Sequence, residues 1–350
     1  MVTPIQIAGR QVGPGHPCFV IAEAGVNHNG DLARAKRLVD AAAESGANAV
    51  KFQTFLSDKV ISPAAPKAAY QSVTAGAAES QLEMVRRLEL PFVAFRELRA
   101  YAREAGILFL STPFDPESAD FLASIDIPAF KVPSGEITNF PFLDHIARKG
   151  KPIIVSTGMS DLEEVEAAVK AIRAAGSREI ALLQCTSNYP ASASSVNLRA
   201  MKTMQERFNV PVGYSDHTMG IEVSLAAAAL GACIIEKHFT LDRNLPGPDH
   251  KASLEPAELV QMVRGIRTVE SALGDGIKSP AEEERDTRSV ARRSIVAVRD
   301  LAAGTQLAPD AIAILRPGTG LPPSAMSRVI GKRLRVNVPA GTPITADMLD

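Results

Sequence analysis

Residues 210–218 read VPVGYSDHT, and residues 232–240 read ACIIEKHFT. Each stretch begins with apolar residues and ends in hydroxyl, charged and imidazole side chains. Consecutive apolar positions are typical of a strand that is buried on both faces, as in a parallel sheet covered by helices. Both stretches are therefore predicted to be buried strands with polar tips.

Six other runs have the same character, and helix-like segments separate them. Eight strand-helix units are the number that closes a (β/α)8 barrel. We therefore predict an α/β protein built on a (β/α)8 TIM barrel. The eight runs are CFVIAEAG (18–25), NAVKFQT (48–54), ILFLSTPF (107–114), AFKVPSGE (129–136), PIIVSTGM (152–159), IALLQCTS (180–187), PVGYSDHT (211–218) and CIIEKHFT (233–240).

The segments between the runs agree with this fold. Residues 31–47 begin with Asp31, a candidate helix cap, and residues 161–176 end at Gly176, a typical C-terminal glycine. The longer insert at residues 56–80 is predicted to lie at the barrel mouth, because long loops there usually serve the site.

After the barrel, predicted over residues 1–274, the character of the chain changes. Residues 275–290 are charged and poor in bulky apolar side chains, as is typical of a linker. Residues 291–350 alternate short apolar pairs with Gly and Pro, and DLAAGTQL (300–307) is echoed by NVPAGTPI (337–344) as a similar turn. We predict that the barrel is followed by a small, mostly β domain.

The composition excludes several classes of protein. The 350 residues carry a formal net charge of -1 without a long block of like charge, which argues against nucleic-acid binding. No stretch approaches the roughly 20 apolar residues that span a bilayer, and the N-terminus lacks the pattern of a signal peptide. Cys18, Cys185 and Cys233 have no metal-ligand spacing and are expected to be reduced core residues. We expect a cytoplasmic protein without a membrane partner.

In such a barrel the active site lies at the C-terminal ends of the strands. Because side chains alternate along a strand, Ser215 and His217 share one face, as do Glu236 and His238, whereas Asp216 points to the other. The polar residues that end the runs are Glu23, Lys51, Gln53, Ser111, Thr112, Lys131, Ser134, Ser156, Thr157, Cys185, Thr186, Ser187, Ser215, Asp216, His217, Glu236 and His238.

Two imidazoles, His217 and His238, end runs that are predicted to be neighbouring strands. Such a pair could share a divalent ion, Mn²⁺, Mg²⁺ or Zn²⁺, with water or substrate as the other ligands. The alternative is a pair of hydrogen-bonded structural histidines at the barrel rim.

Lys51 and Lys131, among several hydroxyls, are typical of a pocket for phosphate or carboxylate. A desolvated lysine could instead form a Schiff base with a carbonyl substrate. Glu23 would be available as a base or water activator. Asp249 could bind a polyol hydroxyl or only stabilise a turn, and His28 is expected to be structural.

Nine motifs together resemble the bacterial sialic acid synthases, the N-acetylneuraminate synthase family. The similarity covers essentially the whole chain, and the final domain is similar to the antifreeze-like (SAF) domain of that family. The motifs are IAEAGVNHNG, VKFQTF, LSTPFD, KVPSGEITN, IIVSTGM, QCTSNYPA, GYSDHTMGI, IEKHFTLDRNLPGPDH and LRPGTG.

The resemblance implies condensation of phosphoenolpyruvate with the open-chain aldehyde of an N-acetylated mannosamine-type sugar, giving a nine-carbon 2-keto acid and phosphate. By motif, His217 and His238 would hold a metal, usually manganese in this family, and Glu23 would act on the attacking water or manage protons there. Arg316 would reach the sugar from a partner chain, which implies a domain-swapped homodimer. The other assignments are phosphoenolpyruvate for Lys51, Thr112, Lys131, Ser134, Ser156, Ser187 and Ser215, and the sugar for Gln53, Tyr189, Asp249 and Arg316.

One motif departs from the family pattern. Some members carry Asn directly after the CT at the phosphate site, whereas this chain has Ser187 there and Asn188 one step later. Since a one-residue step on a strand reverses the face, the phosphate contact is assigned to Ser187.

The chain looks closer to the legionaminic acid synthase branch, which uses a 2,4-diacetamido-trideoxy mannose, than to typical N-acetylmannosamine users. Both alternatives describe the same reaction. A catalytically silent carbohydrate-binding protein is a further alternative, but nothing in the sequence favours it, because Glu23, both lysines and both histidines are present.

Overall fold

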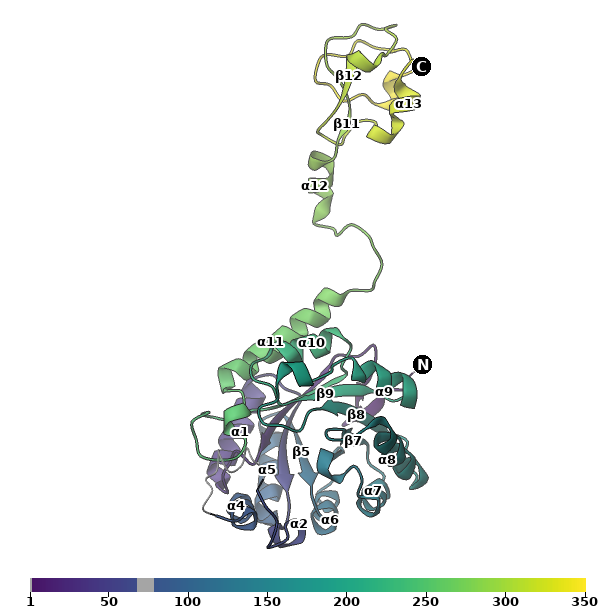
Figure 1. The fold of residues 1–350 in the computed structure, drawn as a ribbon. Coiled ribbons are helices and arrows are strands. Elements are labelled where there is room, and N and C mark those ends of the chain that lie inside the picture. Colours follow the sequence, from purple (N-terminus) through teal and green to yellow (C-terminus); the bar gives the residue numbers. More distant parts are fainter. Residues whose placement is uncertain (1, 68–78) are drawn as a thin grey trace. The chain divides into compact units, whose positions relative to one another are not determined.

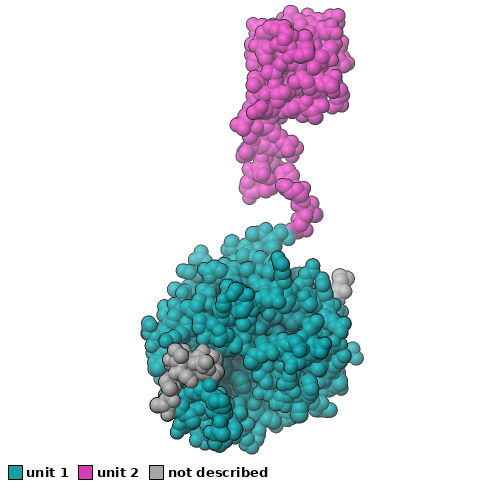
Figure 2. Space-filling model, in the orientation of Figure 1, with its two compact units in different colours: residues 1–274 teal, residues 275–350 magenta. Residues whose placement is uncertain are grey.

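The computed structural model describes residues 2–67 and 79–350, so part of the predicted insert at residues 56–80 lies outside the described residues. The chain divides into two compact units, Met1–Gly274 and Asp275–Asp350 (Figure 2). Each unit has a hydrophobic core of its own.

The first unit is a barrel of eight parallel strands surrounded by helices (Figure 1). The strands follow the order β5-β4-β3-β10-β9-β8-β7-β6, and β5 also lies beside β6, so the sheet closes on itself. Each strand falls within one of the eight predicted runs, which confirms the TIM-barrel prediction. The strands are β3 (Phe19–Gly25), β4 (Ala49–Thr54), β5 (Leu108–Pro113), β6 (Phe130–Val132), β7 (Ile153–Ser156), β8 (Ile180–Cys185), β9 (Val212–Asp216) and β10 (Ile234–His238).

Amphipathic helices cover the outside of the barrel, and capping side chains define where several begin. Asp31 caps α1, as predicted: its carboxylate accepts from the backbone N–H groups of Ala33 and Arg34. Asp161 forms a capping box with Glu164 at the start of α8. The described helices of this unit are α1 (Leu32–Glu44), α2 (Ser57–Val60), α4 (Gln81–Leu88), α5 (Phe92–Glu104), α6 (Pro116–Ser124), α7 (Phe140–Ala147), α8 (Leu162–Ala174), α9 (Ala200–Phe208), α10 (Glu222–Ala229) and α11 (Pro256–Leu273), with 3-10 turns η1 (Ser134–Glu136), η2 (Ala193–Ser195) and η3 (His250–Ala252).

A hairpin closes the N-terminal end of the barrel. β1 (Ile5–Ile7) pairs antiparallel with β2 (Arg10–Val12), and Ile5, Ile7 and Val12 are buried. The interior of the barrel is thus filled at this end, and polar chemistry is left to the opposite end, where the strands finish. The strand residues that pack in one cluster with the hairpin include Ile21, Ala49, Leu110, Ile154, Leu183 and Ile234.

The second unit contains a small β domain. β11 (Ser294–Ala297) pairs antiparallel with β12 (Ile312–Leu315), and isolated bridges connect further segments. Both predicted turns are present, and each places a glycine, Gly304 or Gly341, at positive φ, a conformation that favours glycine.

Short helical elements complete the second unit. Helix α12 (Glu284–Ala291) begins within the segment predicted as a linker and ends one residue beyond it, and its side chains are largely exposed. The domain itself adds α13 (Met326–Val329) and the 3-10 turns η4 (Pro309–Ala311), η5 (Pro323–Ala325) and η6 (Ala346–Met348). Over residues 2–67 and 79–350, none of the helices is long and apolar enough to span a membrane.

Candidate active site

A pocket with a volume of about 430 Å³ lies at the C-terminal ends of the barrel strands. Arg316 belongs to the second unit, so its contact with the sugar stays a prediction. The residues with assigned roles that line the pocket are Glu23, Lys51, Gln53, Thr112, Lys131, Ser134, Ser156, Ser187, Tyr189, Ser215, His217, His238 and Asp249.

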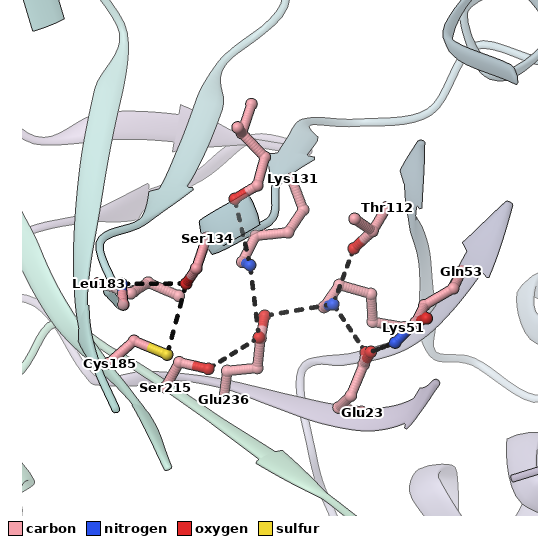
Figure 3. A network of polar contacts seen from close by, with 12 residues as sticks. Glu23, Lys51, Gln53, Thr112, Lys131, Ser134, Leu183, Cys185, Ser215 and Glu236 are labelled. Atoms are coloured by element: carbon pink, nitrogen blue, oxygen red, sulfur yellow. Dashed lines mark hydrogen bonds and ion pairs between the residues drawn. The ribbon is translucent and has the colours of Figure 1, made fainter. Parts of the chain in front are cut away.

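Four buried charged side chains form the centre of this pocket (Figure 3). Lys51 Nζ lies 2.8 Å from Glu23 Oε2 and 3.5 Å from Glu236 Oε2. Lys131 Nζ lies 3.6 Å from Glu236 Oε1. Strand register explains the first contact, because Glu23 and Lys51 are paired between β3 and β4. Two ammonium groups therefore face two carboxylates away from bulk water.

Hydroxyl groups form further hydrogen bonds with these charged side chains. Lys51 Nζ donates to Thr112 Oγ1 at 2.9 Å, and Ser215 Oγ donates to Glu236 Oε1 at 3.0 Å. An arriving phosphate or carboxylate would meet both lysines and the Thr112 hydroxyl, whose own proton is not used in the contact with Lys51.

The two carboxyls have well-separated pKa values. Burial raises the pKa of Glu23 to about 7, against the opposing attraction of Lys51. For Glu236, burial also acts to raise the pKa, but Lys131 and Lys51 outweigh it and hold the pKa at about 2. Glu23 is thus the carboxyl that can exchange a proton near neutrality, and Glu236 is a fixed negative charge.

Hydroxyl groups gather around Gly158 on one side of the pocket. The Gly158 N–H donates to Ser134 Oγ at 3.0 Å, and a Cβ added to Gly158 would lie 2.2 Å from Ser187 Oγ. Ser156 Oγ is buried and finds no hydrogen-bond partner in the described part of the chain. Asn188 is exposed and donates to a backbone carbonyl. Clustered hydroxyls beside a glycine backbone are suited to phosphate or carboxylate oxygens.

The two assigned imidazoles lie near each other, with ring centres 5.4 Å apart. His217 Nδ1 donates to the Thr186 carbonyl at 2.8 Å, which leaves the Nε2 lone pair for another partner. His238 Nδ1 is buried without a hydrogen-bond partner among the described residues. Tyr189 packs against both rings, with centroid distances of 4.1 Å to His217 and 5.6 Å to His238.

This pair fits an incomplete metal site. Across residues 2–67 and 79–350, no three side chains of His, Cys, Asp or Glu come together as metal ligands. His217 and His238 can therefore supply two ligands through unpaired nitrogens, while water or substrate would supply the rest.

Two polar side chains next to this pair were assigned to the sugar. Gln53 Nε2 donates to Glu23 Oε1 at 3.2 Å. Asp249 Oδ2 lies 3.9 Å from His238 Nδ1, and burial raises the pKa of the Asp249 carboxyl to about 6. Both lie on the pocket wall, within one site with the charged centre.

Asp216 points away from the pocket, as the alternation of side chains predicted. It forms a buried ion pair with Lys237, and it accepts hydrogen bonds from Ser224 Oγ and from the N–H and Oγ1 of Thr218. Neither Asp216 nor Lys237 lines the pocket. Both are structural residues on the outer face of β9 and β10.

Three features of the pocket were not predicted from the sequence. Glu236 ends one of the apolar runs, and the sequence indicates no role for it, although it contacts both lysines. Cys18 and Cys233 are buried as expected, whereas Cys185, also buried, lines the pocket and lies 3.7 Å from His217 Nδ1. The third feature is a set of apolar residues from the segments around α2 and α4, which the amphipathic pattern of QLEMVRRL (81–88) could have indicated.

Comparisons with known proteins identify the family. Residues 38–278 match the model of the NeuB family, and residues 292–350 match the SAF domain. A protein from Legionella pneumophila named N,N'-diacetyllegionaminic acid synthase is 50% identical over 334 residues, which is 94% of each chain. A protein of the same name from Campylobacter jejuni is 50% identical over 316 residues, covering 90% of this chain and 95% of that one.

A solved structure gives the same result. The crystal structure of N-acetylneuraminic acid synthetase from Leptospira borgpetersenii, in complex with citrate, is 36% identical, with a TM-score of 0.72. The match covers 82% of this chain and 95% of that one. The family resemblance noted in the sequence is thereby confirmed: the chain belongs to the NeuB family and carries a SAF domain.

Proposed function

We propose that the protein is a nonulosonic acid synthase that condenses phosphoenolpyruvate with an N-acetylated mannosamine-type sugar. The observation that carries this proposal is the single pocket in which two buried lysines and a hydroxyl cluster lie beside a pair of imidazoles. The first group of residues suits a phosphorylated carboxylic acid, and the second suits a metal-bound carbonyl. Relatives that cover most of the chain are named synthases of this kind.

The lysines bind and orient phosphoenolpyruvate in this proposal. Lys51 and Lys131 neutralise its phosphate and carboxylate, while Ser134, Ser156 and Ser187 donate hydrogen bonds to the anionic oxygens. Thr112 and Ser215 fix Lys51 and Glu236 through the hydrogen bonds described above. This arrangement holds C3 of the enol toward the sugar aldehyde.

The reaction joins C3 of phosphoenolpyruvate to the aldehyde carbon, whose oxygen takes up a proton to become a hydroxyl, and water adds to C2. The C2 hydroxyl of the resulting hemiketal phosphate then loses its proton as the C2–O bond to phosphate breaks, which yields the 2-keto group and inorganic phosphate. The two protons of the water thus end on the new hydroxyl and on phosphate. Glu23, whose pKa is about 7, takes the proton of the attacking water. Gln53 holds the Glu23 carboxylate in place at 3.2 Å.

Synthases of the NeuB family generally depend on a metal ion. We propose that His217 and His238 hold it here and that it is Mn²⁺. When bound, such an ion polarises the sugar aldehyde as a Lewis acid. Asp249 and Tyr189 would then orient the sugar next to the imidazoles.

We propose the 2,4-diacetamido-2,4,6-trideoxy sugar of legionaminic acid synthases as the acceptor, ahead of N-acetylmannosamine. Its support is the identity with two proteins named for that product. Since phosphoenolpyruvate is a cytoplasmic metabolite, the proposal places the enzyme in the cytoplasm.

The test is a substrate panel with phosphoenolpyruvate and Mn²⁺. Phosphate release that depends on one of the two amino sugars, together with a nine-carbon 2-keto acid detected by mass spectrometry, would establish the activity. A lysine aldolase is the rival, and Lys131 is its candidate, because burial lowers the pKa of Lys131 while Lys51 is held by two carboxylates. Activity that survives chelation but is lost on borohydride treatment with substrate would favour that rival.

A further inference from the structure

A continuous apolar surface forms one side of the pocket. Val26, Phe55 and Leu88 are buried together, and Val60, Val85 and Phe114 pack against them half-buried. This group is separate from the main core of the barrel. All six residues, here named the apolar wall, also line the pocket.

Helix α4 contributes to this wall through one face. Gln81, Met84, Val85 and Leu88 follow the spacing of a single helical stripe, and all four line the pocket. The stripe is held in place by polar contacts on other sides of α4. Arg86 pairs with Asp58 at 2.5 Å, which ties α4 to α2. Ser80 and Glu83 form a capping box at its start.

The wall offers little to a hydroxyl group. Of the described α2 and α4 residues that line the pocket, including Ile61 at the end of α2, Gln81 carries the only side-chain hydrogen-bonding group. A sugar hydroxyl that lost its water against this surface would stay unpaired, whereas a methyl group would be buried favourably. The same pocket also carries the lysines and hydroxyls that suit an anion.

We infer that the apolar wall selects among acceptor sugars by the group at C6. It favours a methyl group over a hydroxymethyl group at this far end of the sugar. The inference rests on the proposed function and adds the surface that determines specificity. In the proposed function, the lysines and hydroxyls hold phosphoenolpyruvate, and the imidazoles lie at the aldehyde end of the sugar. The wall is then the surface left for the remote, methyl-bearing end of the sugar.

The test compares N-acetylmannosamine with its 6-deoxy analogue, which differ at C6 alone. The expected preference of the wild-type protein for the 6-deoxy sugar is roughly 10- to 100-fold in kcat/KM, the range for one hydroxyl in an apolar pocket. Val85→Thr and Val60→Thr replace a methyl by a hydroxyl of the same shape and give the sugar hydroxyl a partner. Each variant should reduce the ratio of kcat/KM between the two sugars at least about threefold. This change is smaller than the full effect of leaving a hydroxyl unpaired.

Val93→Thr is the matched control, because Val93 lies on α5 and is 69% exposed outside the pocket. It should leave the preference unchanged, and all three variants should keep the wild-type KM for phosphoenolpyruvate. Equal kcat/KM for both sugars, or a preference that Val60→Thr and Val85→Thr leave unchanged, would overturn the inference alone. No phosphate release with either sugar or with the diacetamido sugar would overturn the proposed function, and the inference with it.

Discussion

Lys237 Nζ lies 2.9 Å from Asp216 Oδ2, and neither side chain has any exposed surface. Asp216 ends β9 and is followed by His217, while Lys237 lies in β10 and is followed by His238. The ion pair therefore connects the two strands immediately before the two imidazoles. Its position makes it the outer support of the pair that faces the pocket.

Breaking this ion pair should destabilise the barrel. Lys237→Met leaves Asp216 as a buried charge without its cationic partner, and such losses cost about 3–5 kcal/mol. Urea unfolding measures the change. Lys202→Met is the control, since Lys202 pairs with Glu206 at the surface, where its side chain is 80% exposed. Similar unfolding midpoints for the two variants would contradict this role.

Removing either imidazole should abolish turnover, because each is a proposed ligand of the metal. His217→Ala and His238→Ala should lose at least about 100-fold in kcat, the scale on which a lost electrostatic contributor acts in an active site, and should bind Mn²⁺ more weakly in calorimetry. His16→Ala, at an exposed turn, should behave as wild type. Full activity in either pocket variant would refute the shared metal site.

Gly158→Ala should weaken the binding of phosphoenolpyruvate. The added methyl would lie 2.2 Å from Ser187 Oγ and 2.8 Å from Ser134 Oγ, so the hydroxyls must move apart. Gly135→Ala provides a control in the same pocket, because its added Cβ has no atom within 4 Å. We expect a higher KM for phosphoenolpyruvate in Gly158→Ala than in Gly135→Ala. Equal values would place the anion elsewhere.

The stability of the protein should fall as the pH drops from about 6.5 to about 4, partly because of His28. Burial lowers the pKa of His28 to about 4, as Arg34 and His250 also do, while Asp31 acts in the opposite direction. Below pH 6.5 His28 becomes protonated in the unfolded chain but stays neutral in the folded protein. The folded state therefore loses stability, by up to about 3 kcal/mol at 1.36 kcal/mol per pKa unit.

His28→Asn tests this contribution, because Asn keeps an acceptor for the Gly30 N–H but does not titrate in this range. Thermal unfolding from pH 7.5 to 4.5 should show a shallower decline for the variant. An unchanged slope would assign the decline to other groups.

Two inactive variants should restore activity to each other if Arg316 acts in a partner's pocket. Glu23→Gln removes the proposed base, and Arg316→Ala removes the proposed sugar contact. In a mixed, domain-swapped dimer, the chain that keeps Glu23 receives Arg316 from its partner, so one intact site forms. If Arg316 serves its own chain, the mixed dimer has no intact site. Phosphate release from co-expressed chains, compared with each variant alone, separates the two arrangements.

The barrel could be predicted from the sequence because each of its strands is marked by a local pattern of residues. Continuous apolar runs such as IALLQC (180–185) must be buried on both faces, and eight of them leave one common closed architecture. The convergence of the tips follows from that architecture. The sequence therefore predicts that residues as distant in the chain as Lys51 and Glu236 lie at one end of the barrel, where they are in contact.

The features of the site that could not be predicted from the sequence depend on tertiary contacts. Glu236 lies between two lysines because the closed barrel brings β10 within reach of β4 and β6, which are not its neighbours, and no local pattern encodes this contact. The side-chain alternation used to choose between Ser187 and Asn188 does not extend to them, because β8 ends at Cys185. The apolar wall depends on how α4 packs beside α2 and against Phe55 and Phe114, so its direction follows from tertiary contacts rather than from the helix alone.

The residues that close the N-terminal end of the barrel are synthesised before the strands against which they pack, so their burial is complete only after the last of these strands. Ile5, Ile7 and Val12 pack with side chains from strands as late in the chain as β10. Contacts of such large sequence separation form slowly, and a hairpin without them exposes its isoleucines. Until β10 has been synthesised, the growing chain therefore lacks part of the apolar surface that covers this hairpin in the finished barrel.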